Sequence, residues 1–285
     1  MKKIAFVTCS DKPDFAPDDR DVVSHLVARG ALVHAIPWDS NFNEWQSFDK
    51  VVLRSCWNYH RHPEKFLTWL DHLDRQRVKL FNPVNTVRWN VHKSYLEKLS
   101  VEGVTIPKTA WLSKGSSHNL SVLLNERSWQ KAVVKPAISA TAYNTFLTTP
   151  ERAQQHQSSL NALLAGGDIL VQTFLPEVQQ KGEWSLIFFD KKFSHAVLKR
   201  PREADFRVQD NFGGTTQVAE PPLKLVNQAT KILTLIVEPL LYARVDGVEV
   251  EQQFLLMELE LIEPVLFLTQ SNEAAIRFAN SILNT

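Results

Sequence analysis

Two stretches of the chain, Ala243–Val248 (ARVDGV) and Phe254–Pro264 (FLLMELELIEP), decide how the rest of the sequence is interpreted. Side chains two residues apart in a β-strand point to the same side of the sheet. We therefore expect Glu258 and Glu260 to share one face of a strand. The side chains expected to pack into a core on the opposite face are Leu255, Met257, Leu259 and Leu261.

An antiparallel partner strand over residues 243–248 brings a third carboxylate, that of Asp246, to the same face. Three carboxylates on one face of a largely apolar hairpin repel one another and lose hydration unless a cation is present. Mg²⁺ prefers such oxygen ligands and commonly shares them with phosphates. The pattern is therefore typical of a metal site, and the alternative is an edge hairpin whose acidic face is solvated.

Composition narrows the classes of protein to which the chain can belong. Its 285 residues are 44% hydrophobic and 22% charged, as in proteins that bury a core. The formal charge of +1 gives no overall basic field, so we expect neither a nucleic-acid nor a membrane partner. With two cysteines and no long apolar run, we expect a cytoplasmic protein. Only 9 residues are glycine, and neither the G-x-G-x-x-G fingerprint nor a Walker loop is present.

Hydrophobic periodicity predicts three segments: an α/β domain over residues 1–90 with a small parallel sheet, and two α+β segments over 91–171 and 172–285. The expected strands are 3–9, 32–38, 50–57, 78–82, 109–112, 131–136, 168–174, 183–189, 193–198, 243–248 and 254–261, and the expected helices are 18–29, 63–76, 91–99, 150–164, 223–236 and 272–283.

The spacing of Asp246 and Glu258-x-Glu260 resembles the metal-binding signature of the ATP-grasp superfamily. Arg244 matches the arginine that stabilises the transition state in carboxylate–amine ligases of that superfamily. Segments in the first domain, such as Arg54–Glu64, resemble the glutathione synthetase-like group that includes O-ureido-D-serine cyclo-ligase, the D-cycloserine-forming enzyme. The resemblance implies an ATP-grasp fold, in which a small parallel-sheet domain precedes two α+β subdomains that clasp ATP.

The resemblance also implies which residues bind ATP. Lys93 and Lys135 match the two phosphate-binding lysines, and a lysine that closes an apolar strand, as Lys135 does, is costly to bury without an anion. Glu183 matches the acid that receives the ribose hydroxyls. The matching phosphate flap, where many relatives have glycines, carries the hydroxyls of Ser139 and Thr141. The segment that matches the adenine-binding hinge consists of Gln172, Thr173, Phe174 and Leu175.

A basic segment around Lys199 and Arg207 resembles the mobile loop of bacterial glutathione synthetases, and it ends in the pair Gly213 and Gly214. Lys199 and Arg207 are expected to neutralise the γ-phosphate and the acyl phosphate made from it, with Arg244 as the third catalytic residue. The glycine pair is expected to approach the substrate or to act as a hinge.

The resemblance implies a ligase that uses ATP and Mg²⁺, or Mn²⁺, held by Asp246, Glu258 and Glu260. A small-molecule carboxylate would become an acyl phosphate and react with an amine from the same or another molecule. Arg54, Ser55 and Tyr59 of the first domain are expected to bind that carboxylate, which an Arg fork suits. The alternatives are a nucleotide-binding regulatory protein and a small-molecule kinase without ligation, and homo-oligomer formation is left open.

Overall fold

The computed structural model describes residues 1–202, 205–208, 212–271 and 273–285. Gln209 of the basic segment and Asn272, the expected first residue of the last helix, lie outside the described residues. The helices are α1 (Arg20–Ala28), α2 (Pro63–Arg75), α3 (Val84–Asn90), α4 (Tyr95–Val101), α5 (Leu120–Glu126), α6 (Ala153–Gly166), α7 (Glu177–Gln180), α8 (Leu223–Thr234) and α9 (Ala274–Asn284). The strands are β1 (Lys3–Thr8), β2 (Leu32–Pro37), β3 (Lys50–Leu53), β4 (Leu80–Phe81), β5 (Thr109–Leu112), β6 (Ala132–Pro136), β7 (Phe146–Thr148), β8 (Ile169–Thr173), β9 (Glu183–Phe189), β10 (Lys192–Arg200), β11 (Thr215–Val218), β12 (Tyr242–Val250) and β13 (Gln253–Glu260).

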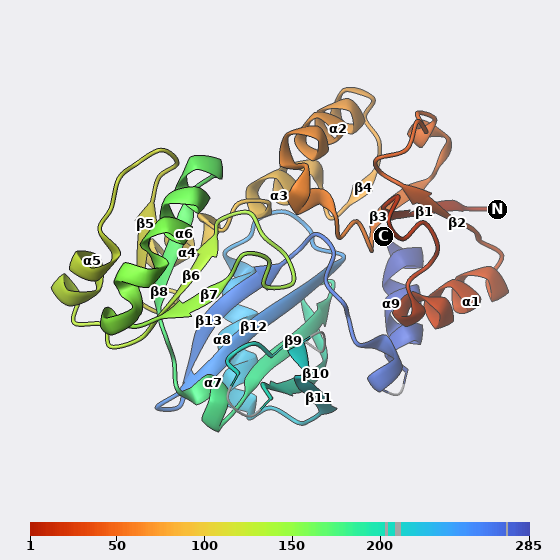
Figure 1. Ribbon diagram of the computed structural model, residues 1–285. Coiled ribbons are helices and arrows are strands. Elements are labelled where there is room, and N and C mark those ends of the chain that lie inside the picture. The colour runs from red at the N-terminus through yellow and green to blue at the C-terminus, as the bar shows by residue number, and fades with distance from the viewer. Residues whose placement is uncertain (203–204, 209–211, 272) are drawn as a thin grey trace.

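The described strands form three sheets that lie side by side, with the largest in the middle (Figure 1). The first sheet is parallel in the order β2-β1-β3-β4. The second is antiparallel in the order β5-β8-β6-β7. The third is antiparallel in the order β11-β10-β9-β12-β13. Mixed parallel and antiparallel sheets of this kind confirm the predicted α/β and α+β fold class.

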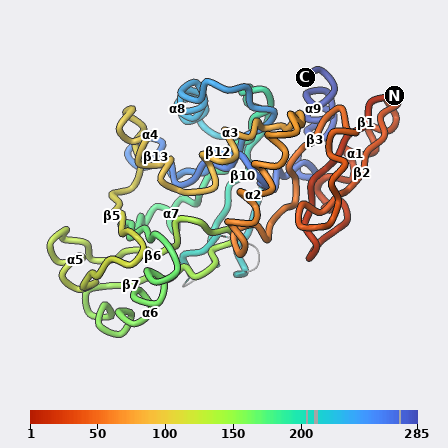
Figure 2. Tube along the Cα trace, turned by 90° about the horizontal axis from the view of Figure 1, so that it is seen from above, coloured from red at the N-terminus to blue at the C-terminus, as the bar shows by residue number. Residues whose placement is uncertain are grey.

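The first segment of the chain and its last helix share one core. Ile4, Phe6 and Leu26 of β1 and α1 pack with Phe278 and Ile282 of α9. The view from above places α9 beside α1 and β1 as well (Figure 2). β8 also continues past the boundary predicted at residue 171. The division into three domains therefore stays a prediction, because α9 packs on both the first segment and the strands β9 and β12 of the third.

Most expected elements are present, with two differences near the site. β3 ends at Leu53 instead of residue 57, because the N–H groups of Arg54 and Ser55 both donate to the Val7 carbonyl and the chain turns away. The helix expected over 91–99 begins only at Tyr95, so that Lys93 lies in the turn between α4 and the preceding helix α3, where its N–H donates to the Ala137 carbonyl. The short elements α3, α5, α7, β7 and β11 were not predicted. No helix among the described residues is long and apolar enough to cross a bilayer.

The pairing of β12 with β13 places the acidic residues as predicted. Arg244 lies opposite Glu260 and Asp246 lies opposite Glu258. Beyond Asp246 the register shifts by one residue, and Gly247 lies opposite Leu256, so Met257 is the extra residue of a β-bulge. A Cβ atom on Gly247 would lie 2.3 Å from the Phe254 ring, so this close crossing requires glycine.

The bulge corrects the prediction that Leu255 and Met257 share a core with Leu259 and Leu261. Leu256 joins Leu259 and Leu261 in the buried core instead. Met257 lines the cavity on the other face, and Leu255 is only partly buried. One inserted residue is enough, because it inverts the alternation of every side chain on its far side.

Candidate active site

A cavity of about 600 Å³ lies where the second and third sheets meet the loop after β3. It gathers most of the predicted site residues from distant parts of the chain. Those that line it are Tyr59, Lys93, Lys135, Ser139, Thr141, Gln172, Thr173, Phe174, Leu175, Glu183, Lys199, Arg207, Arg244, Asp246, Glu258 and Glu260. Arg54, Ser55, Gly213 and Gly214 do not line it.

Carboxylates and cations alternate on the third sheet. The Arg244 guanidinium pairs with Asp246 (Nη2 to Oδ2, 2.9 Å) and with Glu260. Lys199 on the neighbouring β10 pairs with Glu183 (2.6 Å) and with Asp246 (3.2 Å). Each of these side chains is buried or partly buried, so the pairs are weakly screened by water.

The two predicted phosphate-binding lysines differ in their partners. Lys93 Nζ contacts Glu258 Oε1 at 2.8 Å and donates to the Ser139 carbonyl at 2.8 Å. Lys135, at the end of β6, has no carboxylate of the described residues within ion-pair distance. Burial lowers the pKa of Lys135, although the charge of Glu258 opposes that shift. Lys135 is therefore a cation of the cavity wall that still lacks a counter-ion.

The pKa values of the acids follow from these neighbours. Burial acts to raise the pKa of Asp246, but Arg244 and Lys199 outweigh it and hold the pKa at about 2. Burial raises the pKa of Glu260 to about 7 despite the pairing with Arg244, because Asp246 and Glu258 repel its charge. Lys93 and Lys135 outweigh burial at Glu258 and lower its pKa.

The segment predicted as the adenine hinge lies at the end of β8. The N–H groups of Thr173 and Phe174 donate to the carbonyls of Lys108 and Lys131. Lys131 Nζ lies 4.3 Å from the centre of the Phe174 ring. A base that pairs with this segment must therefore use other backbone groups, while the Phe174 ring supplies an apolar wall.

The loop after β6 takes glycine-like conformations without glycine. Thr141, Ala142 and Asn144 have φ values of +50°, +55° and +52°. Such values are unfavourable for residues with a Cβ atom, and Ala142 has no side-chain hydrogen bond to compensate. Ser139 Oγ donates to the Pro136 carbonyl, so this hydroxyl already has a partner within the loop.

The structure contradicts the prediction that Arg54 and Ser55 bind substrate. Arg54 is only 3% exposed and pairs with Asp19 at 2.9 Å, with its guanidinium over the rings of Tyr242 and Phe278. Ser55 is fully buried behind the cavity wall. Of the three first-domain residues predicted as substrate contacts, Tyr59 alone reaches the cavity.

The glycine pair does not line the cavity either. A Cβ atom on Gly214 would lie 2.2 Å from the Val208 carbonyl oxygen, so Gly214 lets the basic segment pack closely on itself. Arg207 does line the cavity, where it pairs with Asp205 at 3.0 Å and lies 3.6 Å from the centre of the Phe212 ring. The contact of Gly213 and Gly214 with substrate therefore stays a prediction, and in this structure Gly214 shapes the segment that carries Arg207.

The cavity wall also includes residues that were not predicted as site residues, among them Asn90 and Glu263. The Asn90 amide donates to the Leu259 carbonyl (2.8 Å) and accepts from the Leu261 N–H (2.9 Å). These two backbone groups flank Glu260 on the outer edge of β13, so Asn90 fixes the position of Glu260. Both residues lie in segments that carry the family resemblance, but no role was assigned to them, and the tertiary contacts of Asn90 supply one.

The donor chemistry of the cavity fits Mg²⁺. Asp246, Glu258 and Glu260 supply carboxylate oxygens from two paired strands on the face that lines the cavity. In the part of the chain that the structure describes, no three His, Cys, Asp or Glu side chains are close enough to hold a metal ion. Each carboxylate is turned toward a lysine or arginine instead, and these ion pairs must open before the three can share a cation.

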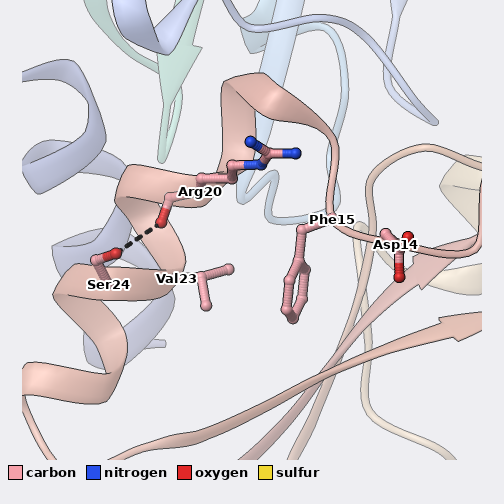
Figure 3. Close-up of a pocket in the computed structure, with 5 residues that line it drawn as sticks. All are labelled: Asp14, Phe15, Arg20, Val23 and Ser24. Carbon is pink, nitrogen blue, oxygen red and sulfur yellow. Dashed lines mark hydrogen bonds between the residues drawn. The ribbon is translucent and has the colours of Figure 1, made fainter.

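A smaller hollow of about 380 Å³ lies on the first segment, away from these residues. Arg20, Val23 and Ser24 of α1 line it together with Asp14 and Phe15 of the preceding loop (Figure 3). Ser24 Oγ donates to the Arg20 carbonyl within the helix. No predicted site residue lines this hollow, so the larger cavity is the candidate active site.

Comparison with known proteins agrees with this fold. The sequence model for the N-terminal domain of D-cycloserine synthetase DcsG matches residues 4–82. The cycloserine biosynthesis protein DcsG of Streptomyces lavendulae is 29% identical over 272 residues, which cover 89% of this chain and 88% of that protein.

Solved structures of similar fold include D-cycloserine synthetase and two further ligases. The crystal structure of D-cycloserine synthetase DcsG matches with a TM-score of 0.88 and 26% identity, over 99% of each chain. D-alanine–D-alanine ligase from Bacillus anthracis, complexed with ATP, matches with a TM-score of 0.71 and 15% identity, over 100% of this chain and 97% of that one. The ATP-grasp ligase PsnB, complexed with minimal precursor, Mg and ADP, matches with a TM-score of 0.65 and 14% identity, over 98% of this chain and 96% of that one. Over nearly its whole length the chain is thus similar to D-cycloserine synthetase DcsG, and its fold is that of the ATP-grasp ligases.

Proposed function

We propose that the chain activates a small carboxylate, of an amino acid or a peptide-like molecule, as an acyl phosphate and joins it to an amine. The amine belongs to a second substrate or to the same molecule. The observation that carries the proposal is the cavity wall on which Lys199, Arg244, Asp246, Glu258 and Glu260 alternate in charge. The ligases with this fold that were solved with ATP, or with Mg and ADP, support ATP and Mg²⁺ as the ligands.

The chain's own residues would act in the first step as follows. Lys93 and Lys135 hold the phosphates of ATP from the side of the second sheet, and Lys199 and Arg207 neutralise the γ-phosphate. A substrate carboxylate oxygen attacks the γ-phosphorus, the bond to the β-phosphate oxygen breaks, and ADP leaves. Mg²⁺, held by Asp246, Glu258 and Glu260, would supply charge neutralisation at the phosphates.

Arg244 would act in the second step. The amine attacks the acyl carbon, negative charge develops on the acyl oxygen, and inorganic phosphate leaves. The Arg244 contacts use its Nε–H, both Nη2–H groups and one Nη1–H, the last toward the Val265 carbonyl. One Nη1–H is left to donate to the developing oxyanion.

Lys135 offers the sharpest test of ATP binding, because it is a cavity cation without a counter-ion. We expect Lys135→Ala to weaken binding of AMPPNP with Mg²⁺ by about 10-fold or more, the loss of one charge-assisted contact. The matched control is Lys108→Ala, which removes an exposed lysine at the start of β5. Equal affinity of the two variants in calorimetric titration would contradict the proposed phosphate site.

Release of ADP and phosphate across a panel of D- and L-amino acids tests the reaction itself. A ligase releases both products and consumes the amine. A phosphorylated amino-acid derivative that accumulates without phosphate release would indicate a small-molecule kinase. Tight AMPPNP binding with no turnover of any carboxylate would instead support a nucleotide-binding regulatory protein.

A further inference from the structure

Phe267 adopts a backbone conformation that is unfavourable for a bulky side chain. Its φ and ψ angles are +53° and +39°, in the left-handed region. Of the residues with positive φ that the structure describes, Phe267 alone carries an aromatic ring. Such conformations persist only where the surrounding structure enforces them, and they gather at functional sites. The conformation therefore indicates that the place of this side chain matters.

The backbone on both sides of Phe267 is held by hydrogen bonds to other segments. The Leu266 N–H donates to Asp18 Oδ2 (3.2 Å), and the Thr269 N–H donates to Asp18 Oδ1 (3.3 Å). His195 Nε2 donates to the Leu266 carbonyl (2.8 Å) from β10. Phe267 cannot return to a relaxed conformation without disturbing these three bonds, so the fold around it offsets the unfavourable φ.

This conformation places the Phe267 ring on the cavity wall next to Arg244. Val265 and Phe267 line the cavity. Leu266 and Leu268 are buried instead in the core that the first segment shares with α9. The centre of the Phe267 ring lies 5.7 Å from the Arg244 Cζ atom, and Arg244 Nη1 donates to the Val265 carbonyl (3.1 Å). One short segment thus holds Arg244 with a carbonyl and covers it with a ring.

The place beside Arg244 is where the acyl phosphate would react under the proposed function. A water oxygen that reached the acyl carbon would attack it, and the bond from that carbon to the phosphate oxygen would break. The carboxylate and inorganic phosphate would be released, and one ATP would be consumed without a product bond. An aromatic ring displaces water from this side and offers no donor that competes with Arg244 for the oxyanion.

We infer that the Phe267 ring keeps water away from the acyl phosphate beside Arg244, and so couples ATP cleavage to transfer of the acyl group. The inference rests on the proposed function and adds a shielding residue to it. The ring also attracts the guanidinium by cation–π contact, which helps to hold Arg244 in place. Because the ring excludes water and does not bind ATP, its loss should change the ratio of products and not KM for ATP.

Hydroxylamine provides the assay, because it converts acyl phosphates to hydroxamates without the natural amine. Wild type with ATP, Mg²⁺, saturating hydroxylamine and its best amino acid should form hydroxamate and ADP in nearly equal amounts. In Phe267→Gly and Phe267→Ala we expect the ratio of hydroxamate to ADP to fall by about two-fold or more, with KM for ATP within about two-fold of wild type. The matched control is Phe193→Ala, which removes an exposed phenylalanine of β10 and should keep the wild-type ratio.

The two substitutions of Phe267 separate the ring from the backbone. Glycine adopts the left-handed conformation without steric cost, whereas alanine keeps the unfavourable Cβ atom. Both lack the ring, so both should show the lower ratio. A wild-type ratio in both variants, or a lower ratio in only one of them, would overturn the inference.

Methylglyoxal, which modifies arginine side chains, gives a readout that needs no substrate. Arg244 is only 9% exposed. Peptide mass spectrometry should show that it reacts about five-fold faster or more in Phe267→Gly, the loss of one cation–π contact, while the exposed Arg75 of α2 reacts at the wild-type rate. Equal reactivity of Arg244 in the two proteins would also overturn the inference. Wild type that forms no hydroxamate refutes the proposed function, and the reactivity of Arg244 then decides whether Phe267 covers it.

Discussion

Asn90 holds the strand edge beside Glu260, and its truncation is the most informative perturbation of the fold around the site. Asn90→Ala leaves the Leu259 carbonyl and the Leu261 N–H without partners on the outer edge of β13. Each buried polar group that loses its partner costs about 1–3 kcal/mol. Because Asn90 borders the cavity, water can replace part of the loss, and we expect the free energy of unfolding to fall by about 2–4 kcal/mol.

Asn85→Ala is the matched control, since Asn85 lies on the same helix α3 but is exposed. Both variants gain the same helix propensity, so the difference between them isolates the two hydrogen bonds. Urea unfolding followed by tryptophan fluorescence measures that difference, and AMPPNP titration with Mg²⁺ should show weaker binding by Asn90→Ala. Unfolding free energies that agree within about 0.5 kcal/mol would refute the reasoning, because surface substitutions have effects of that size.

Two further predictions concern buried cations outside the cavity. Arg54→Met leaves Asp19 buried without a partner and should lower the free energy of unfolding, measured in urea, by about 3–5 kcal/mol. The added change Asp19→Asn should recover part of that loss. An Arg54→Met variant as stable as wild type but with weakened substrate binding would restore Arg54 as a substrate contact. Burial, with the charges of Lys2 and Lys79, lowers the pKa of Lys50 from 10.5 to about 8. Between these two pKa values Lys50 is deprotonated in the folded protein but protonated in the unfolded chain. The free energy of unfolding should therefore rise with pH by about 1–2 kcal/mol after solvent screening. Lys50→Met should lack that rise. If the free energy of unfolding of wild type and of Lys50→Met changes with pH in the same way, the lowered pKa of Lys50 is contradicted.

The sequence predicted the acidic centre well, because strand alternation and residue spacing are local. The pairing of Asp246 with Glu258 and of Arg244 with Glu260 follows from two short strands and the hairpin between them. The same alternation failed at Met257, where one bulged residue inverts the pattern. That bulge depends on how Gly247 crosses the Phe254 ring, and no single-strand periodicity contains this information.

Residues whose role depends on distant partners could not be assigned in advance. Arg54 has the chemistry of a carboxylate-binding residue, but Asp19, from the turn before α1, pairs with it in the interior. The role of Asn90 depends on its two hydrogen bonds with the edge of β13, which its neighbours in the sequence do not reveal. Charge and side-chain type therefore indicate what a residue can bind, whereas the tertiary contacts decide whether it is available.

The formation of an acyl phosphate is the central claim, and hydroxylamine trapping measures it most directly. Wild type incubated with ATP, Mg²⁺, hydroxylamine and the amino-acid panel should produce a hydroxamate of at least one amino acid, with ADP and phosphate in equal amounts. Lys135→Ala should reduce all three products together, and Lys108→Ala should not. ADP formation without hydroxamate, or a stable phosphorylated product in its place, would contradict the account.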